Sequence, residues 1–153
     1  GKQLREKQKL KAYYGILEKQ FKIYVEAAMH SKGNSGEKLV QRLEQRLDNM
    51  TYRLGFASTL RQARQMVVHG HILVNGKKVD RPSYKVEVGD IISLKEKSKS
   101  IAIFKDSFTS TTTNLPYLEK NLNDFSGKLI AQPKRDQVPI EVTDSYIIEF
   151  YSK

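Results

Sequence analysis

The chain has 153 residues, of which 39% are hydrophobic, and its formal net charge is +10. This length and apolar fraction support one or two domains with a real core and argue against a disordered tail. The positive charge predicts a polyanionic partner, either a nucleic acid or an acidic membrane surface. No apolar run approaches the ~18 residues that span a bilayer, and the N-terminus shows no apolar leader block, so we expect no membrane segment.

The charge is concentrated in the first two thirds of the chain. Residues 1–45 carry ten Lys and Arg against five acids, residues 46–99 carry eleven against five, and residues 100–153 carry six against seven. The polyanion-binding surface should therefore lie before residue 100. The chain has no cysteine, which excludes disulfides, thiolate metal sites and cysteine nucleophiles, and this is compatible with a reducing cytoplasm.

The N-terminal part is predicted to be helical. Residues 3–14 indicate a short basic helix ended at Gly15, and residues 17–29 a second helix, followed by a turn-rich loop at 31–36. Residues 37–54 carry the strongest apolar stripe in the chain, which predicts one long helix with Gly55 at its C-terminal end.

A further helix is predicted to start after Ser58 or Thr59, either of which can cap it, and to end at Gly70. The apolar period then changes from helix to strand. Asn75-Gly76 lies between Ile72-Leu73-Val74 and Lys77-Lys78-Val79 and favours a tight hairpin turn, because both turn residues tolerate positive φ. Val86 and Val88 before Gly89-Asp90, with Ile92 and Leu94 after it, predict a second hairpin on the same sheet.

The pattern weakens beyond residue 99. Residues 100–108 indicate a short helix, and the Ser/Thr-rich run that follows indicates a solvated loop over 107–114. Residues 115–130 fit neither period clearly. Residues 143–151 predict a short helix that buries Ile147, Ile148 and Phe150.

Four polar residues lie beside the apolar stripe of the predicted long helix. Their spacing of i, i+4, i+7 and i+11 puts them on one face with no acid among them: Arg42, Arg46, Asn49 and Arg53. Such a row can follow the phosphates of a nucleic acid. The next helix adds Arg61, Arg64 and Gln65, and the short connection should place the two basic faces side by side. The alternative is that these arginines only solvate two surface helices, but their clustering and the net charge favour phosphate binding.

Three other groups of residues are candidates for RNA contact. His69 and His71 flank a glycine, and with no cysteine and only one other histidine they favour a turn with local or RNA-backbone hydrogen bonds over a metal site. Asn75 and Lys77 lie at the hairpin tip, which is either a plain turn or also an RNA contact. Near the N-terminus, basic and aromatic residues alternate: Lys7, Lys9 and Lys11 precede Tyr13 and Tyr14, which are expected to pack in the core or to stack on bases.

The sequence shows no motif of an enzyme. It lacks a glycine-rich phosphate loop, a GxSxG nucleophile motif and paired metal-binding histidines, and its carboxylates mostly neighbour Lys or Arg. We therefore expect no catalytic residues, no cofactor, no metal and no small-molecule substrate.

These motifs resemble the small αL-type RNA-binding module. The resemblance rests on Arg46-Leu47-Asp48-Asn49, Arg53-Leu54-Gly55-Phe56-Ala57, Arg61-Gln62-Ala63-Arg64-Gln65, His69-Gly70-His71-Ile72 and Val74-Asn75-Gly76-Lys77. The flanks are similar to the bacterial small-subunit ribosomal protein four family, through Glu6-Lys7-Gln8-Lys9-Leu10-Lys11 near the start and Ile148-Glu149-Phe150-Tyr151-Ser152-Lys153 at the end. The resemblance therefore runs nearly from end to end.

The resemblance implies an α+β protein with a discontinuous helical rRNA-binding domain, residues 1–45 with 127–153, and an inserted module of two helices on an antiparallel sheet, residues 46–126. It implies a structural constituent of the small ribosomal subunit, located in the cytoplasm, that binds 16S rRNA as a primary binder, nucleates subunit assembly and contributes to translational accuracy. It also implies small-subunit ribosomal protein five as a neighbour, and mRNA close to where it enters the ribosome.

The chain departs from the family pattern in three ways. The family's further N-terminal arm, which in some members binds a metal, is not found here, Leu60 stands where many members have a basic residue, and the Ser/Thr run is unusual. Two alternatives remain open: a free-standing module that binds tRNA or the RNA of stalled ribosomes, and an accessory domain of an enzyme. Under the favoured interpretation, replacing Arg46 and Arg53 by alanine should weaken RNA binding without disturbing the fold.

Overall fold

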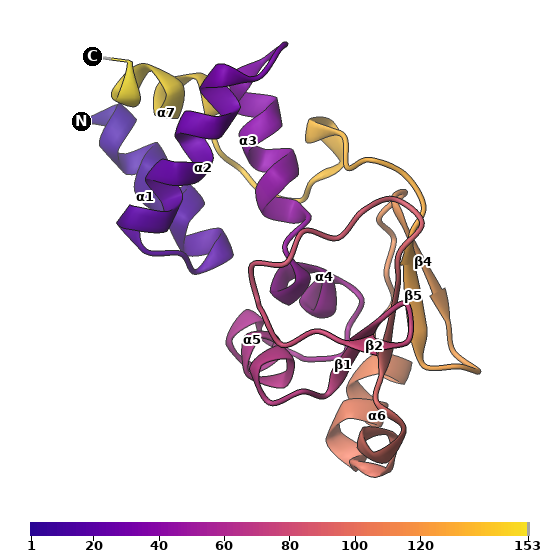
Figure 1. Ribbon diagram of the computed structural model, residues 1–153. Helices are drawn as coiled ribbons and strands as arrows, with labels where there is room; N and C mark the ends of the chain where they lie inside the picture. Colours follow the sequence, from indigo (N-terminus) through magenta and orange to yellow (C-terminus); the bar gives the residue numbers. More distant parts are fainter. Residues whose placement is uncertain (153) are drawn as a thin grey trace. The chain divides into compact units, whose positions relative to one another are not determined.

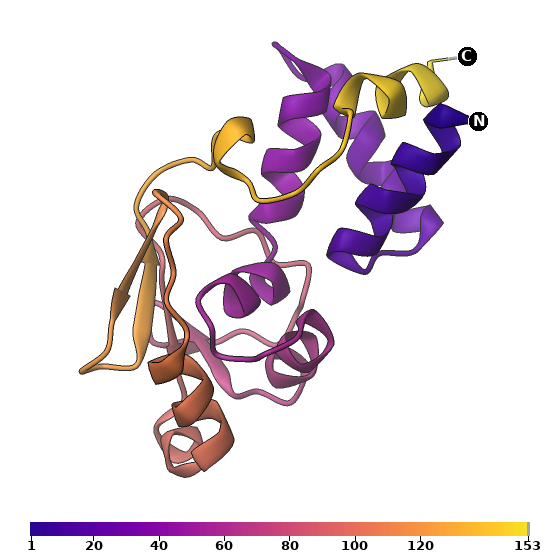
Figure 2. The same cartoon turned by 180° about the vertical axis from the view of Figure 1, so that it is seen from behind.

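The computed structural model describes residues 1–152, and the chain divides into two compact units. The first unit comprises residues 1–44 and the chain from 134 onward, and the second comprises residues 45–133. Figures 1 and 2 show helices in the first unit and both helices and strands in the second, which confirms the predicted α+β class. Among the described residues, no helix is long and apolar enough to cross a membrane.

The helical unit joins the two ends of the chain around one core. Its helices are α1 (Lys2–Tyr14), α2 (Glu18–His30), α3 (Ser35–Glu44) and α7 (Asp144–Tyr151), with a 3-10 turn η2 (Arg135–Gln137). The predicted helices at 3–14, 17–29 and 143–151 are thus confirmed, whereas Ser35 and Gly36, expected in a loop, already belong to α3. Gly15 ends α1 with φ 60°, a left-handed conformation that suits glycine.

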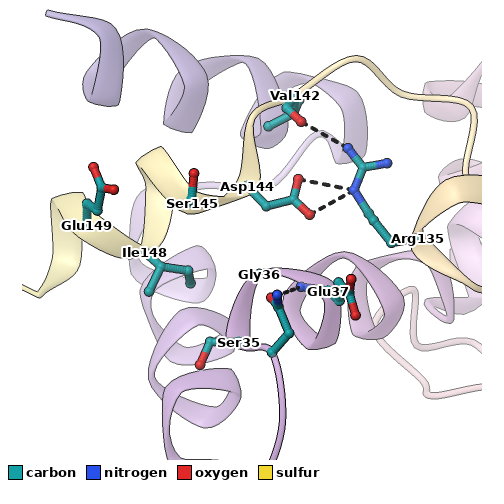
Figure 3. Close-up of a pocket in the computed structure, with 10 residues that line it drawn as sticks. Ser35, Gly36, Glu37, Arg135, Val142, Asp144, Ser145, Ile148 and Glu149 are labelled. Carbon is teal, nitrogen blue, oxygen red and sulfur yellow. Dashed lines mark hydrogen bonds and ion pairs between the residues drawn. The ribbon is translucent and has the colours of Figure 1, made fainter.

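The helical core is made by the apolar stripes of α1, α2, α3 and α7. Its fully buried members include Leu10, Phe21, Val40, Leu43 and Ile147. The N-terminal ends of α3 and α7 meet closely, as Figure 3 shows, since a Cβ on Gly36 would lie 2.6 Å from Cβ of Asp144. Arg135 Nε donates to both carboxylate oxygens of Asp144, at 3.1 and 2.8 Å, and fixes the start of α7.

The second unit packs helices against a five-stranded antiparallel sheet. Its elements are α4 (Leu47–Arg53), α5 (Leu60–Val68), β1 (Ile72–Val74), β2 (Lys77–Lys78), β3 (Ile91–Leu94), the 3-10 turn η1 (Glu96–Ser100), α6 (Ala102–Ser110), β4 (Leu118–Asn121) and β5 (Ser126–Leu129). The strand order is β2-β1-β3-β5-β4. Asn75 and Gly76 turn β1 into β2 with φ of 51° and 81°, so the predicted hairpin is confirmed.

The prediction of one long helix over residues 37–54 is wrong. α3 ends at Glu44 and α4 begins at Leu47, with Arg46 in an extended conformation and bridged to Lys85. Backbone contacts from a distant loop hold the break open, because Leu47 N–H donates to the Tyr84 carbonyl at 2.9 Å and Asp48 N–H to the Pro82 carbonyl at 3.2 Å. The row of Arg42, Arg46, Asn49 and Arg53 therefore does not lie along one helix.

Two further predictions for the second unit are wrong. Val86 and Val88 do not form a hairpin with β3, since Val86 N–H donates to the Gln45 carbonyl at 2.8 Å and β3 pairs with β1 and β5. The Ser/Thr run is not a solvated loop throughout: residues 107–110 belong to α6, and the Ser107 hydroxyl donates to the Gly55 carbonyl at 2.8 Å.

The segment 115–130, which fitted no period, forms the β4–β5 hairpin. Its pairing with β3 draws β5 into the sheet unit, so the boundary between the two units falls after Pro133 and not at 127.

Candidate nucleic-acid interface

The outer face of α5 is an exposed surface that carries several of the predicted residues. Ala63, Met66 and Val67 are buried and pack α5 onto the core, which turns the opposite face to solvent. Arg61, Gln65 and His69 are exposed on that face, and α5 contains no acidic residue. The Thr59 hydroxyl accepts the Gln62 N–H at 3.1 Å and caps the helix, as predicted.

Lys78 extends this surface past the C-terminal end of α5. It is exposed on β2, and a Cβ built on Gly70 would lie 3.1 Å from its Cδ. We call Arg61, Arg64, Gln65, His69 and Lys78 the α5 surface. Lys78 was not among the predicted site residues, although it directly follows Lys77 in the sequence.

A buried carboxylate organises the arginines at the base of this surface. Asp48 accepts from Arg46 through Nε and a terminal nitrogen, each at 3.1 Å, and from Arg64 Nε at 3.0 Å. The side chains of Asp48 and Arg46 are 1% and 4% exposed, whereas that of Arg64 is 35% exposed. Arg46 is therefore a structural residue, which corrects its assignment to RNA, and Arg64 remains accessible.

The other members of the predicted row have different surroundings. Asn49 is buried, so it cannot reach RNA, which also corrects its assignment. Arg53 is partly exposed at the end of α4, with its guanidinium 5.8 Å from the Tyr52 ring centre. Arg42 belongs to the helical unit, where its guanidinium lies 5.1 Å from the Tyr24 ring centre.

The N-terminal lysines are largely committed to carboxylates. Lys7 Nζ lies 2.6 Å and Lys11 Nζ 3.1 Å from Oε1 of Glu18, and Lys9 Nζ lies 3.1 Å from Glu6. Lys7 is also 4.7 Å from the Phe150 ring centre and only 9% exposed, so its assignment to RNA is corrected. Lys11 is 17% exposed and Lys9 44%, which leaves Lys9 the most accessible of the three.

The cluster around Glu18 shifts two pKa values. Desolvation raises the pKa of Glu18, but hydrogen bonds from Lys7, Tyr151 and Lys11 outweigh it and lower the pKa to about 2. Burial and the neighbouring Glu18 carboxylate raise the pKa of Tyr151, whose hydroxyl donates to Glu18 Oε2 at 2.8 Å. These groups join α1, α2 and α7, so their role is in folding.

The two histidines of the His69-Gly70-His71 motif differ in their surroundings. His71 Nδ1 lies 2.7 Å from the Ser98 hydroxyl, and its ring packs edge-on against Phe104 at 4.9 Å. Burial, with His69 and Lys95 nearby, lowers the pKa of His71. His71 thus anchors η1 and α6, whereas His69 faces solvent. Within residues 1–152 no group of three His, Cys, Asp or Glu side chains could hold a metal ion.

The hairpin tip is held rigidly. The Asn75 side chain donates to Asp90 at 2.8 Å and accepts the Ile91 N–H at 2.9 Å. Lys77 and Lys78 follow directly and are exposed. Asn75 therefore orients the turn, and the two lysines are the groups at the tip that can meet an anion.

The second unit is a small module of helices on a sheet, its helix α5 is cationic and has no acidic residue, and the chain carries a net charge of +10. These are the features of a nucleic-acid-binding protein. The family described as "S4 domain" matches residues 45–92, and the family described as "Ribosomal protein S4/S9 N-terminal domain" matches residues 1–44. The chain belongs to the small ribosomal subunit protein uS4 family.

Curated relatives match over the whole chain. Small ribosomal subunit protein uS4B of Clostridium acetobutylicum is 59% identical, and the match covers 80% of that protein. Small ribosomal subunit protein uS4 of Thermoanaerobacter sp. and that of Thermoanaerobacter pseudethanolicus are each 51% identical, with 74% of their length covered.

Proposed function

We propose that this protein is a structural constituent of the small ribosomal subunit in the cytoplasm and that it binds 16S rRNA directly. The observation that carries this proposal is 59% identity over the full chain to a small-subunit protein. The net charge of +10 and the exposed α5 surface supply the physical means of binding. The family supports a structural role in the ribosome and not catalysis.

The α5 surface is suited to phosphates and not to base edges. Arg61 and Arg64 supply planar guanidinium groups that can donate two hydrogen bonds to one phosphate, and Lys78 adds a point charge. A-form RNA has a deep, narrow major groove that side chains cannot read, so the binding should depend on the shape of an RNA junction. Gln65 adds an uncharged donor and acceptor between the cations.

The proposal is tested by binding of the full chain to a 16S rRNA fragment over a series of salt concentrations. Arg61→Ala with Lys78→Ala should weaken binding and reduce the slope of log affinity against log salt by roughly 0.7–0.9 for each phosphate that is no longer neutralised. Lys19→Ala with Lys97→Ala, which also removes two exposed positive charges but leaves the α5 surface intact, is the matched control. Equal effects of the double variant and the control would contradict the assignment.

We further propose that the protein binds 16S rRNA as a primary binder that helps nucleate assembly, next to small-subunit ribosomal protein five and near the incoming mRNA, and that it contributes to translational accuracy. What supports this proposal is that both parts of the chain match families of this kind, residues 1–44 the ribosomal protein S4/S9 N-terminal domain and residues 45–92 the S4 domain. Reconstitution with 16S rRNA and no other protein tests primary binding. If the protein were instead a stress factor that binds other RNAs, it would fail to enter small-subunit particles. The role in accuracy is tested by the misreading frequency of cells that carry the Arg61→Ala and Lys78→Ala variant, and an unchanged frequency would count against it.

A further inference from the structure

The five-stranded sheet of the second unit has one covered face and one open face. Ile72, Ile92 and Leu129 point toward α4 and α5 and are buried. The strand register turns the alternate residues to the other side: Leu73, Ile91, Ser93, Ser126, Lys128, Glu119 and Asn121. Figures 1 and 2 show α4 and α5 on the covered side. On the open side, the 3-10 turn η1 contributes Glu96 and Lys99.

The open face is hollow at its centre. Ser93 pairs with Ser126, and this pair of small side chains lies between Leu73 on β1 and Asn121 on β4. Longer side chains rim the hollow, which has a volume of about 460 Å³. We call this hollow the serine groove. Ile91, 43% exposed, adds an apolar wall.

The serine groove differs in charge from the rest of the chain. Its lining includes three carboxylates, Glu96, Glu119 and Asp124, and two lysines, Lys99 and Lys128, which gives a net charge of −1. Both lysines face an acid, since Lys99 Nζ lies 3.1 Å from Glu96 and Lys128 pairs with Glu119 across the strands. In a chain of net charge +10, the lining of this groove thus has the opposite sign of charge, which disfavours phosphates.

We propose that the serine groove docks a cationic segment of another small-subunit protein, an inference that rests on the proposed function. An apolar side chain of that segment packs against Leu73 and Ile91, and its Lys or Arg side chains pair with Glu119 and Asp124, both of which line the groove. The opposite charges favour this occupant over RNA, because RNA phosphates would meet a net negative surface. The two sides of the unit thus contact different partners, with RNA at the α5 surface and protein at the sheet.

The absence of cysteine makes the test direct, because a single introduced thiol is the only one in the chain. Ser126→Cys and Ile91→Cys place thiols in the groove, and Ser58→Cys places one beside the start of α5. Maleimide labelling rates are compared in the free chain, in its complex with 16S rRNA alone, and in subunits reconstituted from 16S rRNA and the purified small-subunit proteins. Both groove thiols should be protected at least tenfold, but only in the complete subunits, whereas Ser58→Cys should be protected by rRNA alone.

The outcomes separate the two proposals. Protection of Ser126→Cys by rRNA alone would make the groove an RNA surface, and labelling at the free rate in complete subunits would leave it without a partner; either result overturns the inference. If rRNA fails to protect Ser58→Cys, this counts against RNA binding at the α5 surface. The protection of the groove thiols is then judged independently of that result. Adding Glu119→Lys and Asp124→Lys should reduce the groove protection, whereas Glu87→Lys, an exposed acid outside the groove, should not. Equal effects would overturn the cationic chemistry.

Discussion

Replacing Asp48 by asparagine should destabilise the second unit strongly. Asp48 is the buried carboxylate that accepts hydrogen bonds from both Arg46 and Arg64. Asparagine keeps the shape but removes the negative charge, and the Arg46 side chain, 4% exposed, would keep its positive charge without this counter-ion. Breaking a buried pair by removing one partner costs about 3–5 kcal/mol. Since whole domains are stable by only about 5–15 kcal/mol, much of the unit's stability would disappear.

Hydrogen exchange at the amides of α4 and α5, measured at increasing urea concentrations, gives this cost for the second unit separately from the helical unit. The matched control is Glu87→Gln, which breaks the pair of Lys85 and Glu87 in the same unit. That pair is separated by 3.6 Å, with side chains 45% and 57% exposed. An exposed pair of this kind contributes at most about 1 kcal/mol.

A double-mutant cycle then isolates the ion pair. The double change Arg46→Met with Asp48→Asn should cost less than the sum of the two single changes, with a coupling of about 0.5–3 kcal/mol. Replacing Arg46 by alanine should likewise destabilise the unit strongly, contrary to the expectation from sequence that alanine at Arg46 and Arg53 spares the fold. The reasoning would be refuted if Asp48→Asn and Glu87→Gln unfolded at the same urea concentration.

Three other changes test the fold. Because the pKa of Glu18 is lowered to about 2 from an ordinary 4.5, its carboxylate stabilises the helical unit above about pH 4.5, and this stabilisation disappears as the pH falls toward 2. Since the side chain is 47% exposed, Glu18→Gln should lower the stability of the helical unit by only about 1 kcal/mol at neutral pH. Acid titration monitored by circular dichroism measures this difference. Gly127→Ala should cost about 1–3 kcal/mol in thermal melting, since the new methyl group would overlap the buried Leu54 side chain, and an unchanged melting temperature would contradict this contact. Thr59→Ala should cost about 1 kcal/mol and speed amide exchange at the start of α5, and equal exchange rates would show that the cap is dispensable.

The features that sequence predicted correctly have local causes. Gly15 ends α1 and Thr59 caps α5 through hydrogen bonds to residues three positions away. Asn75-Gly76 adopts the turn that its tolerance of positive φ favours. Such signals lie within one turn of the chain, so they can be read without knowing what packs nearby.

The break between α3 and α4 has a distant cause. Leu43 and Leu47 keep the helical spacing of the apolar stripe across it, and both are fully buried, so the pattern gives no sign of an interruption. The backbone of Pro82 and Tyr84 takes the hydrogen bonds that a continuous helix would have used. Only the tertiary fold brings that loop to the start of α4.

The site was predicted less well than the fold for the same reason. Spacing places a basic side chain on a face, but its partners decide whether it can reach RNA. Lys7 meets Glu18 and Phe150, and His71 meets Ser98, all from other elements. An acid within the Arg46-Leu47-Asp48-Asn49 motif was the available signal that some arginines would be paired internally.

The buried carboxylate of Asp48 orders this surface without cancelling its charge. Two guanidinium groups share one carboxylate, so the trio retains a net charge of +1. Arg64 is held at Nε by a carboxylate that is only 1% exposed, while 35% of its own side chain remains exposed. Part of its rotamer freedom is therefore given up on folding and not on binding, which lowers the entropic cost of holding a phosphate. Arg61, on the exposed face of α5, lacks the buried anchor to Asp48. Under the proposed function, the two arginines, three residues apart on one helix, therefore differ in kind: Arg64 would meet a phosphate as a preorganised donor, and Arg61 would adapt to the RNA.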